Sequence, residues 1–177
     1  MGTETIEYDS FGRISQKDNE TIGLSKIYLY FPNNTVKEIH TLKDGQLLYY
    51  ESFDYDKNGK WVYIDKNGEV TRYKYDGMNR LTRAWNDNTY TEYEFDNFNN
   101  ISKEYELIGD SIETKSYYYD NANHLLLQDG KETVQYEYDN AGNLVKEITG
   151  IGSNAETAYY SYDGYNRLSG YADSDIS

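Results

Sequence analysis

The chain of 177 residues has no cysteine and a single proline, Pro32. Without cysteine it can form neither a disulfide nor a thiolate metal site, although this absence does not assign it to a cellular compartment. Pro32 suits a turn and not a central strand. The sequence also lacks any apolar run near the ~18 residues that a membrane-spanning helix needs. We therefore expect no membrane insertion.

Residues of the types used in catalysis are few or do not occur in a recognisable catalytic motif. The two histidines, His40 and His124, have no partner that the sequence identifies, and no serine or threonine lies in a nucleophile-elbow motif. With 31 acidic residues in the chain, spacing alone selects no catalytic carboxylate pair. We expect a protein that is not an enzyme and that carries no cofactor.

Positive charge is also in short supply. Lys and Arg number 17 against 31 Asp and Glu, which gives a net charge of −14. Such a charge disfavours nucleic acid and anionic membrane surfaces as partners. The acidic residues are spread along the whole chain and have the distribution of a solvated face, so they identify no acidic site.

Tyrosine, in contrast, is abundant, with 22 copies, and it recurs in a fixed setting. In the stretch 136–144, Tyr136 and Tyr138 alternate with a charged residue, as on one face of a strand. Asp139 is suited to start a type I turn, because its carboxylate can accept bonds from amides two residues on. Gly142 fits the left-handed position that ends a three-residue hairpin loop, and Leu144 begins the return strand.

This motif repeats along the chain roughly every 20–25 residues, the period of a repeat array. Seven copies begin with Asp and end with Gly or Asn: Asp9 and Gly12, Asp56 and Gly59, Asp76 and Asn79, Asp96 and Asn99, Asp120 and Asn123, Asp139 and Gly142, and Asp163 and Asn166. Two degenerate copies are 31–34, without the aspartate, and 65–68, in which Ile64 replaces the aromatic residue. We expect positive φ at the fourth position of each copy, where only Gly and Asn occur.

The copies resemble the tyrosine-aspartate repeat, also called the YD or Rhs repeat. The resemblance is carried by segments 8–14, 75–81, 138–144 and 162–168, and it extends over nearly the whole chain. It implies a strand-rich array in a secreted or cell-surface protein; some members of the family curl into hollow shells around a toxin segment. The family's downstream core with its Asp-Pro-Gly signature and a toxin domain are both missing. The chain is expected to be a short array or a fragment, and its first residues show no signal peptide.

The repeats predict an all-β fold: a repetitive antiparallel β-hairpin meander forming one curled or coiled sheet. We expect one array over residues 1–177, with about eight hairpins and about sixteen strands. Open sheets beyond ~10 strands tend to curl. The aromatic row is assigned to the concave side and the charged row to the outside. Aliphatic residues are too few for a thick core between two layers.

Calcium is an alternative use of the turns. Segments 56–59 and 65–68 resemble the start of a calcium loop, which needs an oxygen ligand at every second position and a closing bidentate carboxylate. The closing Glu is absent, since the twelfth positions are Asn67 and Asp76. The turn itself accounts for Asp, Asn and Gly, so we expect no metal.

The predicted function is that of a non-enzymatic structural or interaction module, whose partner is a protein or a glycan at the cell surface. The alternative is a carbohydrate-binding module that uses exposed aromatic side chains. Its candidate is Trp85, which precedes a turn, whereas Trp61 occupies a position that is apolar in every copy and is expected to pack in the core. On the turn, we expect Gly142→Val to destabilise the protein and Gly142→Asn to be nearly neutral, because other copies already carry Asn there.

Overall fold

The computed structural model describes residues 4–173, which form sixteen β-strands and one short 3-10 helix. The all-β class and the antiparallel hairpin meander predicted from the repeats are thereby confirmed. The chain divides into two compact units, Met1–Asn88 and Thr89–Ser177, which are described separately. The prediction of a single array over residues 1–177 stays a prediction.

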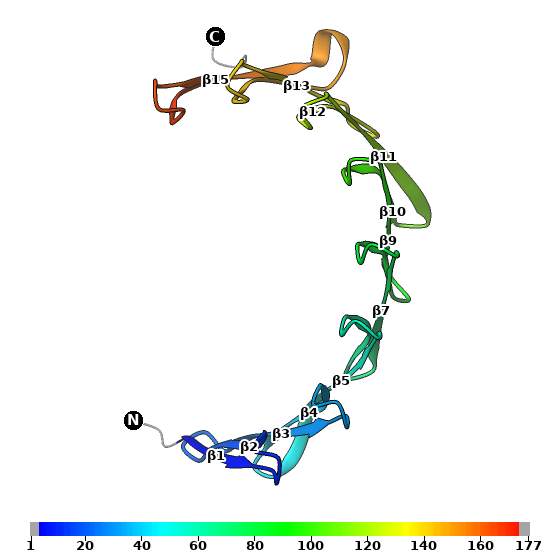
Figure 1. Ribbon diagram of the computed structural model, residues 1–177, viewed down its shortest axis with the longest axis vertical. Helices are drawn as coiled ribbons and strands as arrows, with labels where there is room; N and C mark the ends of the chain where they lie inside the picture. The colour runs from blue at the N-terminus through cyan, green and yellow to red at the C-terminus, as the bar shows by residue number, and fades with distance from the viewer. Residues whose placement is uncertain (1–3, 174–177) are drawn as a thin grey trace. The chain divides into compact units, whose positions relative to one another are not determined.

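The first unit contains four hairpins in chain order. Its strands are β1 (Glu4–Tyr8), β2 (Ile14–Asn19), β3 (Leu24–Tyr30), β4 (Val36–Lys43), β5 (Gln46–Tyr55), β6 (Trp61–Lys66), β7 (Glu69–Tyr75) and β8 (Leu81–Trp85). Each strand pairs antiparallel with the next one along the chain. Among the described pairings none joins β1 to β8, so the sheet of this unit is open (Figure 1).

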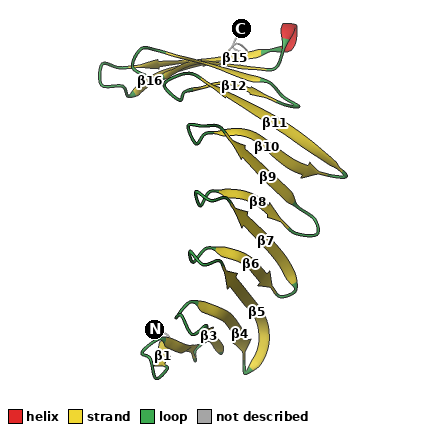
Figure 2. Ribbon diagram, turned by 45° about the vertical axis from the view of Figure 1, so that its right-hand side comes forward, coloured by secondary structure: helices red, strands yellow, loops and turns green. Residues whose placement is uncertain are grey.

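The second unit repeats this plan. Its elements are β9 (Tyr90–Phe95), β10 (Ile101–Ile108), β11 (Ser111–Tyr119), β12 (Leu125–Asp129), β13 (Val134–Tyr138), β14 (Leu144–Thr149), the 3-10 helix η1 (Gly152–Asn154), β15 (Glu156–Tyr162) and β16 (Leu168–Asp173). The strands again pair antiparallel in chain order. Figure 2 shows the hairpins as side-by-side pairs of strands joined by short loops, with no second layer of strands upon them.

Some of the strands alternate between covered and exposed side chains, as the aromatic pattern predicts, whereas β2, β8 and β14 are half-covered throughout. In β13, Val134, Tyr136 and Tyr138 are covered, while Gln135 and Glu137 are exposed. The same alternation holds at the end of β7, where two tyrosines flank the exposed Lys74. A period of two is expected for a sheet with unlike faces.

The core is very thin. Over residues 4–173, the only buried apolar side chains are Ile64 and Val134, each 8% exposed. Because a single-layer sheet has no second layer above it, apolar side chains are covered mainly by neighbours on their own face. Examples are the stacked pair Phe53 and Trp61, with ring centroids 6.1 Å apart. Backbone pairing and contacts between adjacent hairpins therefore carry much of the stability.

Candidate functional site

The repeated turn is the feature on which sequence and structure agree most closely. In the copy at Asp139, the carboxylate Oδ1 accepts bonds from the amides of Ala141 and Asn143, both at 2.9 Å, and the Gly142 amide donates to the Asp139 carbonyl at 3.0 Å. The amide of Asp139 in turn donates to the Asn143 carbonyl at 2.9 Å. These bonds close the three-residue loop expected from the sequence.

All seven Asp copies have this geometry, because each aspartate accepts from the amides two and four residues on. The fourth position has positive φ in every copy, as the restriction to Gly and Asn predicts. The φ values are 75° at Gly12, 69° at Asn34, 79° at Gly59, 67° at Asn79, 71° at Asn99, 65° at Asn123, 83° at Gly142 and 58° at Asn166.

The tetrad at 65–68 is a different turn, and its assignment as a degenerate copy is wrong. Lys66 pairs directly with Glu69, and both Asn67 and Gly68 have positive φ, 55° and 94°. These are the features of a two-residue type I′ loop, for which Asn-Gly is a favoured sequence. The tetrad therefore joins two successive hairpins, β5–β6 and β7–β8, and does not connect the strands of one hairpin.

The residue that follows the Gly or Asn is here named the closing residue, and in six copies its side chain binds the second carboxylate oxygen of the turn. The closing residues are Arg13, Thr35, Lys60, Arg80, Asn100, His124, Asn143 and Arg167. The three arginines donate Nε to the Asp Oδ2 of their own turn at 2.7 Å. Asn100, His124 and Asn143 reach the same oxygen at 3.0, 2.9 and 2.9 Å.

These bonds stabilise the ionised aspartates. The pKa of Asp139 is lowered, first by the bond from the Asn143 side chain and then by the Asn143 amide. The pKa of Asp76 is lowered chiefly by the Arg80 amide, with the guanidinium of Arg80 adding to the effect. The turn thus gives each of its seven aspartates a structural role. For residues 4–173, no group of three or more His, Asp or Glu side chains is placed to hold a metal ion.

Contacts between successive turns are what sequence reasoning missed. The Asn at a fourth position accepts a bond from the preceding turn through its Oδ1: Arg13 to Asn34 at 2.8 Å, Asn58 to Asn79 at 2.8 Å, Asn100 to Asn123 at 3.1 Å and Asn143 to Asn166 at 3.2 Å. Asn at these places supplies a hydrogen-bond acceptor besides tolerating positive φ. The available signal was an amide or guanidinium donor in the turn before each such Asn.

The aromatic residue just before each turn, here named the anchor, also bridges two hairpins. In three copies the anchor hydroxyl donates to the carbonyl of the first residue of the preceding return strand: Tyr30 to Ile14 at 2.7 Å, Tyr119 to Ile101 at 2.9 Å and Tyr138 to Leu125 at 3.0 Å. Closing residues cover the anchor ring of the next hairpin. Arg13 lies 4.4 Å from the Tyr30 centroid, and Lys60 lies 5.4 Å from that of Tyr75.

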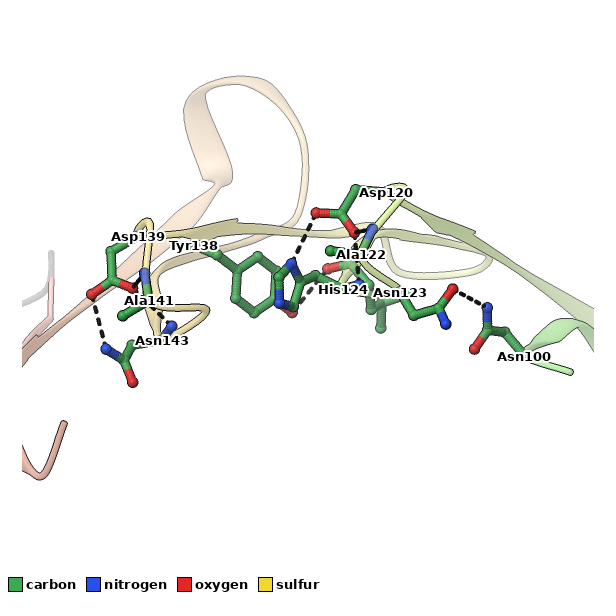
Figure 3. A network of polar contacts seen from close by, with 10 residues as sticks. Asn100, Asp120, Ala122, Asn123, His124, Tyr138, Asp139, Ala141 and Asn143 are labelled. Atoms are coloured by element: carbon green, nitrogen blue, oxygen red, sulfur yellow. Dashed lines mark hydrogen bonds and ion pairs between the residues drawn. The ribbon is translucent and has the colours of Figure 1, made fainter. Parts of the chain in front are cut away.

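His124 is a closing residue that covers the anchor ring of the next hairpin with an aromatic ring of its own (Figure 3). Its Nδ1 lies 2.9 Å from Asp120 Oδ2, and its ring stacks on Tyr138 with centroids 4.8 Å apart and an interplanar angle of 22°. The other histidine, His40, lies 3.0 Å from Glu38 on the same strand. Both histidines thus have carboxylate partners that the sequence did not identify.

The two tryptophans reverse the expectation drawn from the sequence. Trp61, expected in the core, is 49% exposed and stacks on Phe53. Trp85, the candidate for an exposed ligand-binding ring, is half-buried, with the Arg83 guanidinium 5.9 Å from its ring. The position of Trp61 is apolar in every copy, but a single-layer sheet covers only part of so large a side chain.

Shallow hollows lie between neighbouring turns. One of about 660 Å³ in the first unit is lined by Asp56, Tyr73, Tyr75 and Asp76, among others. A related one in the second unit, of about 320 Å³, is lined by Asp96, Tyr117, Tyr119 and Asp120, among others. Both follow the repeat, and their carboxylates are already engaged in the turns. Over the described residues there is no helix long and apolar enough to span a membrane.

No family model and no curated protein sequence matches the chain. Solved structures do match it. The crystal structure of TcdB2-TccC3-Cdc42 aligns with a TM-score of 0.77 at 17% identity, over 94% of this chain and 10% of that chain. TcdB2-TccC3 without its hypervariable C-terminal region also aligns with a TM-score of 0.77 at 17% identity, over 95% of this chain and 10% of that chain. The Photorhabdus luminescens Tc holotoxin pore gives a TM-score of 0.59 at 17% identity, over 95% of this chain and 11% of that chain.

This chain therefore spans about a tenth of the length of the chains that it resembles. At 17% identity the likeness shows the fold alone. It is a fold of consecutive antiparallel hairpins, found here in both units and shared with a segment of these toxin complexes.

Proposed function

We propose that the chain is a YD-repeat array that acts as a non-enzymatic structural and interaction module of a secreted or cell-surface protein. The main observation behind this proposal is that the repeated residues form the turns and the contacts between hairpins. Asp and Gly or Asn build each turn, while anchors and closing residues join each hairpin to the next. Each hairpin buries little apolar surface of its own, so neighbours stabilise one another, as in other repeat proteins.

The likeness to TcdB2-TccC3 supports the same proposal, because the aligned segment is there one part, about a tenth, of a longer chain. An extracellular location is part of this proposal, and the resemblance of the repeat motif to the YD repeat supports it. The surface fits an interaction role, since large apolar side chains such as Phe11, Phe98 and Tyr165 are more than two-thirds exposed at the turn tips, at 78%, 73% and 83%.

A deletion tests the modular role. Removing residues 31–55 joins Tyr30 directly to Asp56, which restores an intact motif and removes one whole repeat. The shortened chain should keep its strand signal in circular dichroism and unfold cooperatively with reduced stability. Removing β4 alone (residues 36–43) should abolish folding of the first unit, because two first strands then follow each other. If the whole-repeat deletion is as damaging as the β4 deletion, the hairpins are not modular.

A glycan array separates this role from carbohydrate binding. For a structural module the array stays blank, and Trp61→Ala and Trp85→Ala alter only local packing. Trp61 is the sharper probe, because its exposed ring is the one of the two that could stack on a sugar face. Specific glycan binding that is lost in Trp61→Ala and kept in Trp85→Ala would replace the proposal by the carbohydrate-binding alternative. Glycoside turnover lost on changing one carboxylate would instead indicate an enzyme.

A further inference from the structure

The six joints between successive hairpins that lie within the two units share one register. In each joint, the second residue after the start of the return strand faces the residue three before the next anchor. The pairs are Gln16 and Ile27, Glu38 and Ser52, Tyr63 and Arg72, Lys103 and Ser116, Leu127 and Gln135, and Lys146 and Tyr159.

This register does not depend on the length of the connection. Residues 44–45 form the short loop between β4 and β5, while residues 150–155 connect β14 to β15, yet the pairing is the same. The register of a joint is therefore determined by the two strands and by the contacts between their turns. It does not require a connecting loop of any particular length.

The first described strand, β1, presents one half of such a joint. Within residues 4–173, β1 pairs only with β2, and all of its residues are exposed. Its anchor, Tyr8, is 61% exposed, and no partner of its hydroxyl lies in this range. The other tyrosine anchors, Tyr30, Tyr55, Tyr75, Tyr119, Tyr138 and Tyr162, are all half-buried. Three of them, Tyr30, Tyr119 and Tyr138, donate to the preceding return strand.

The last strand presents the other half. Over the same residues β16 pairs only with β15, and its first residue, Leu168, is 58% exposed. The closing residue Arg167 binds Asp163 just as Arg13 binds Asp9. The Arg167 side chain is nevertheless 74% exposed against 23% for Arg13, which lies over the anchor ring of the next hairpin. Arg167 lies 5.3 Å from the centroid of Tyr165 in its own turn, as Arg13 lies 5.0 Å from that of Phe11. Among the described residues, however, no anchor ring of a following hairpin lies over Arg167.

We infer that β16 of one copy of this chain pairs antiparallel with β1 of a second copy. The shared register places Tyr171 opposite Glu4 and Gly170 opposite Thr5. Across this joint, the Tyr8 hydroxyl donates to the Leu168 carbonyl, and the Arg167 guanidinium covers the Tyr8 ring. Because the two surfaces differ, the contact is heterologous and adds copies head to tail. The inference rests on the geometry of the six joints, so it stands apart from the location and family proposed above.

Net charge sets the conditions. Each copy carries −14, so copies repel one another at low ionic strength, and added salt screens this repulsion. The contact of the Arg167 guanidinium with the Tyr8 ring and the backbone hydrogen bonds between β16 and β1 are less sensitive to screening by salt, because they act at contact distance. Association is therefore expected to strengthen as salt rises from low to physiological ionic strength.

Sedimentation velocity on the full chain, from micromolar to near-millimolar concentration, tests the inference. We expect a concentration-dependent series of species larger than the monomer. Arg167→Asn keeps the bond to Asp163, as Asn143 does to Asp139, and removes the guanidinium that would cover the Tyr8 ring, together with its contact to Tyr165. It should weaken association roughly three- to tenfold. Tyr8→Phe should weaken association about fivefold through the lost hydroxyl.

The matched control is Met78→Ser, an exposed turn-tip change away from both edges, which should leave association unchanged. Circular dichroism checks that every variant is folded. A monomer at all concentrations and salt levels overturns the inference. So does an association that neither Arg167→Asn nor Tyr8→Phe weakens.

Cysteine cross-linking tests the register, and the natural chain supplies a cysteine-free background. Glu4→Cys with Tyr171→Cys places the two thiols directly opposite each other across the joint, within reach of a disulfide. Mild oxidation should convert this variant to a ladder of covalent oligomers. Glu4→Cys with Ser169→Cys, displaced by two residues, should cross-link at least tenfold more slowly. Equal rates for the two pairs would show that the strands do not meet in the inferred register.

Discussion

The ring of His124 lies face to face with the ring of Tyr138 from the next hairpin, and its Nε2 occupies the space beside Gly142. An added Cβ on Gly142 would lie 3.0 Å from that Nε2. In the copies ending in Asn34, Asn79, Asn123 and Asn166, the Asn side chain accepts a bond from the preceding turn. At Gly12 and Gly59 no atom lies within 4 Å of an added Cβ. At Gly142, the ring of His124 from the preceding hairpin thus fills the space that an Asn side chain would need. Figure 3 shows this ring stacked on Tyr138.

The first prediction revises the expectation that Gly142→Asn is nearly neutral. Because the Asn side chain displaces His124 from Tyr138, we expect a cost of about 1–3 kcal/mol in the free energy of unfolding. Gly59→Asn is the matched control, since no atom lies within 4 Å of an added Cβ there, and it should change stability by less than ~0.5 kcal/mol. Urea denaturation of the two variants measures the difference.

The double variant His124→Asn with Gly142→Asn sharpens this prediction. It recreates the donor and acceptor pair found between Asn100 and Asn123 and between Asn143 and Asn166. The double change should therefore recover at least half of the stability lost in Gly142→Asn. Additive losses would show that His124 and Gly142 are not coupled.

Gly142→Val tests the backbone conformation itself. The φ of 83° at Gly142 is strongly unfavourable for a β-branched residue. We expect Val to cost more than ~1–2 kcal/mol at this position, and a similar cost for Gly59→Val, where no side chain interferes. If Val proves neutral at Gly59, the positive φ is not what selects Gly and Asn.

The contrast between these positions shows what the sequence could and could not reveal. The Asp turn was predictable because all of its bonds lie within five consecutive residues, from Asp139 to Asn143. The roles of His124 and Asn166 were not, because their partners lie in neighbouring hairpins and depend on the register between strands. Trp61 was misjudged because an apolar pattern does not reveal how many layers cover it. The tetrad at 65–68 has the residues of the motif, but Asn-Gly there forms a two-residue turn.

Acid should destabilise the protein through the turn aspartates. The pKa of Asp9, Asp56, Asp76, Asp120, Asp139 and Asp163 is lowered in the folded state. An Asp with a lowered folded pKa stabilises the fold above its unfolded value of about 3.9, and this contribution is lost as pH falls through the folded value. The free energy of unfolding should therefore decline below about pH 4. Asp139→Asn, which no longer titrates, should reduce the pH dependence seen in urea melts. An unchanged dependence would contradict the assignment.

Alkali should act through the half-buried tyrosines. The pKa of Tyr119 and of Tyr138 is raised chiefly by burial, and that of Tyr117 by burial and by its bond to Glu104. A tyrosine with a raised folded pKa favours the folded state below the unfolded value of about 10, and this advantage is lost as pH rises through the folded value. The rise in tyrosinate absorbance of these residues should coincide with loss of the strand signal. Complete ionisation with an intact circular dichroism spectrum would contradict this coupling.

The last prediction concerns the joint between β12 and β13, which is the shortest of the six. Only two residue pairs, Leu127 with Gln135 and Gln128 with Val134, form its ladder, whereas the other joints have four or more. The stack of His124 on Tyr138 and the bond from Tyr138 to Leu125 therefore carry a larger share of this joint. In hydrogen exchange, we expect amides of this ladder to exchange faster than those between β10 and β11.

His124→Asn isolates the contribution of the ring, because Asn can keep the bond to Asp120 as Asn100 keeps its bond to Asp96. Losing the stack should accelerate opening of the β12–β13 ladder about two- to tenfold. Asn100→Ala is the matched change at the joint of β10 and β11, and its effect should stay at that joint. The contacts of Asn100 and His124 lie within their own turns and with the next hairpin. If both variants accelerate exchange in the β12–β13 ladder to a similar extent, the second unit opens as a whole and its joints are not independent.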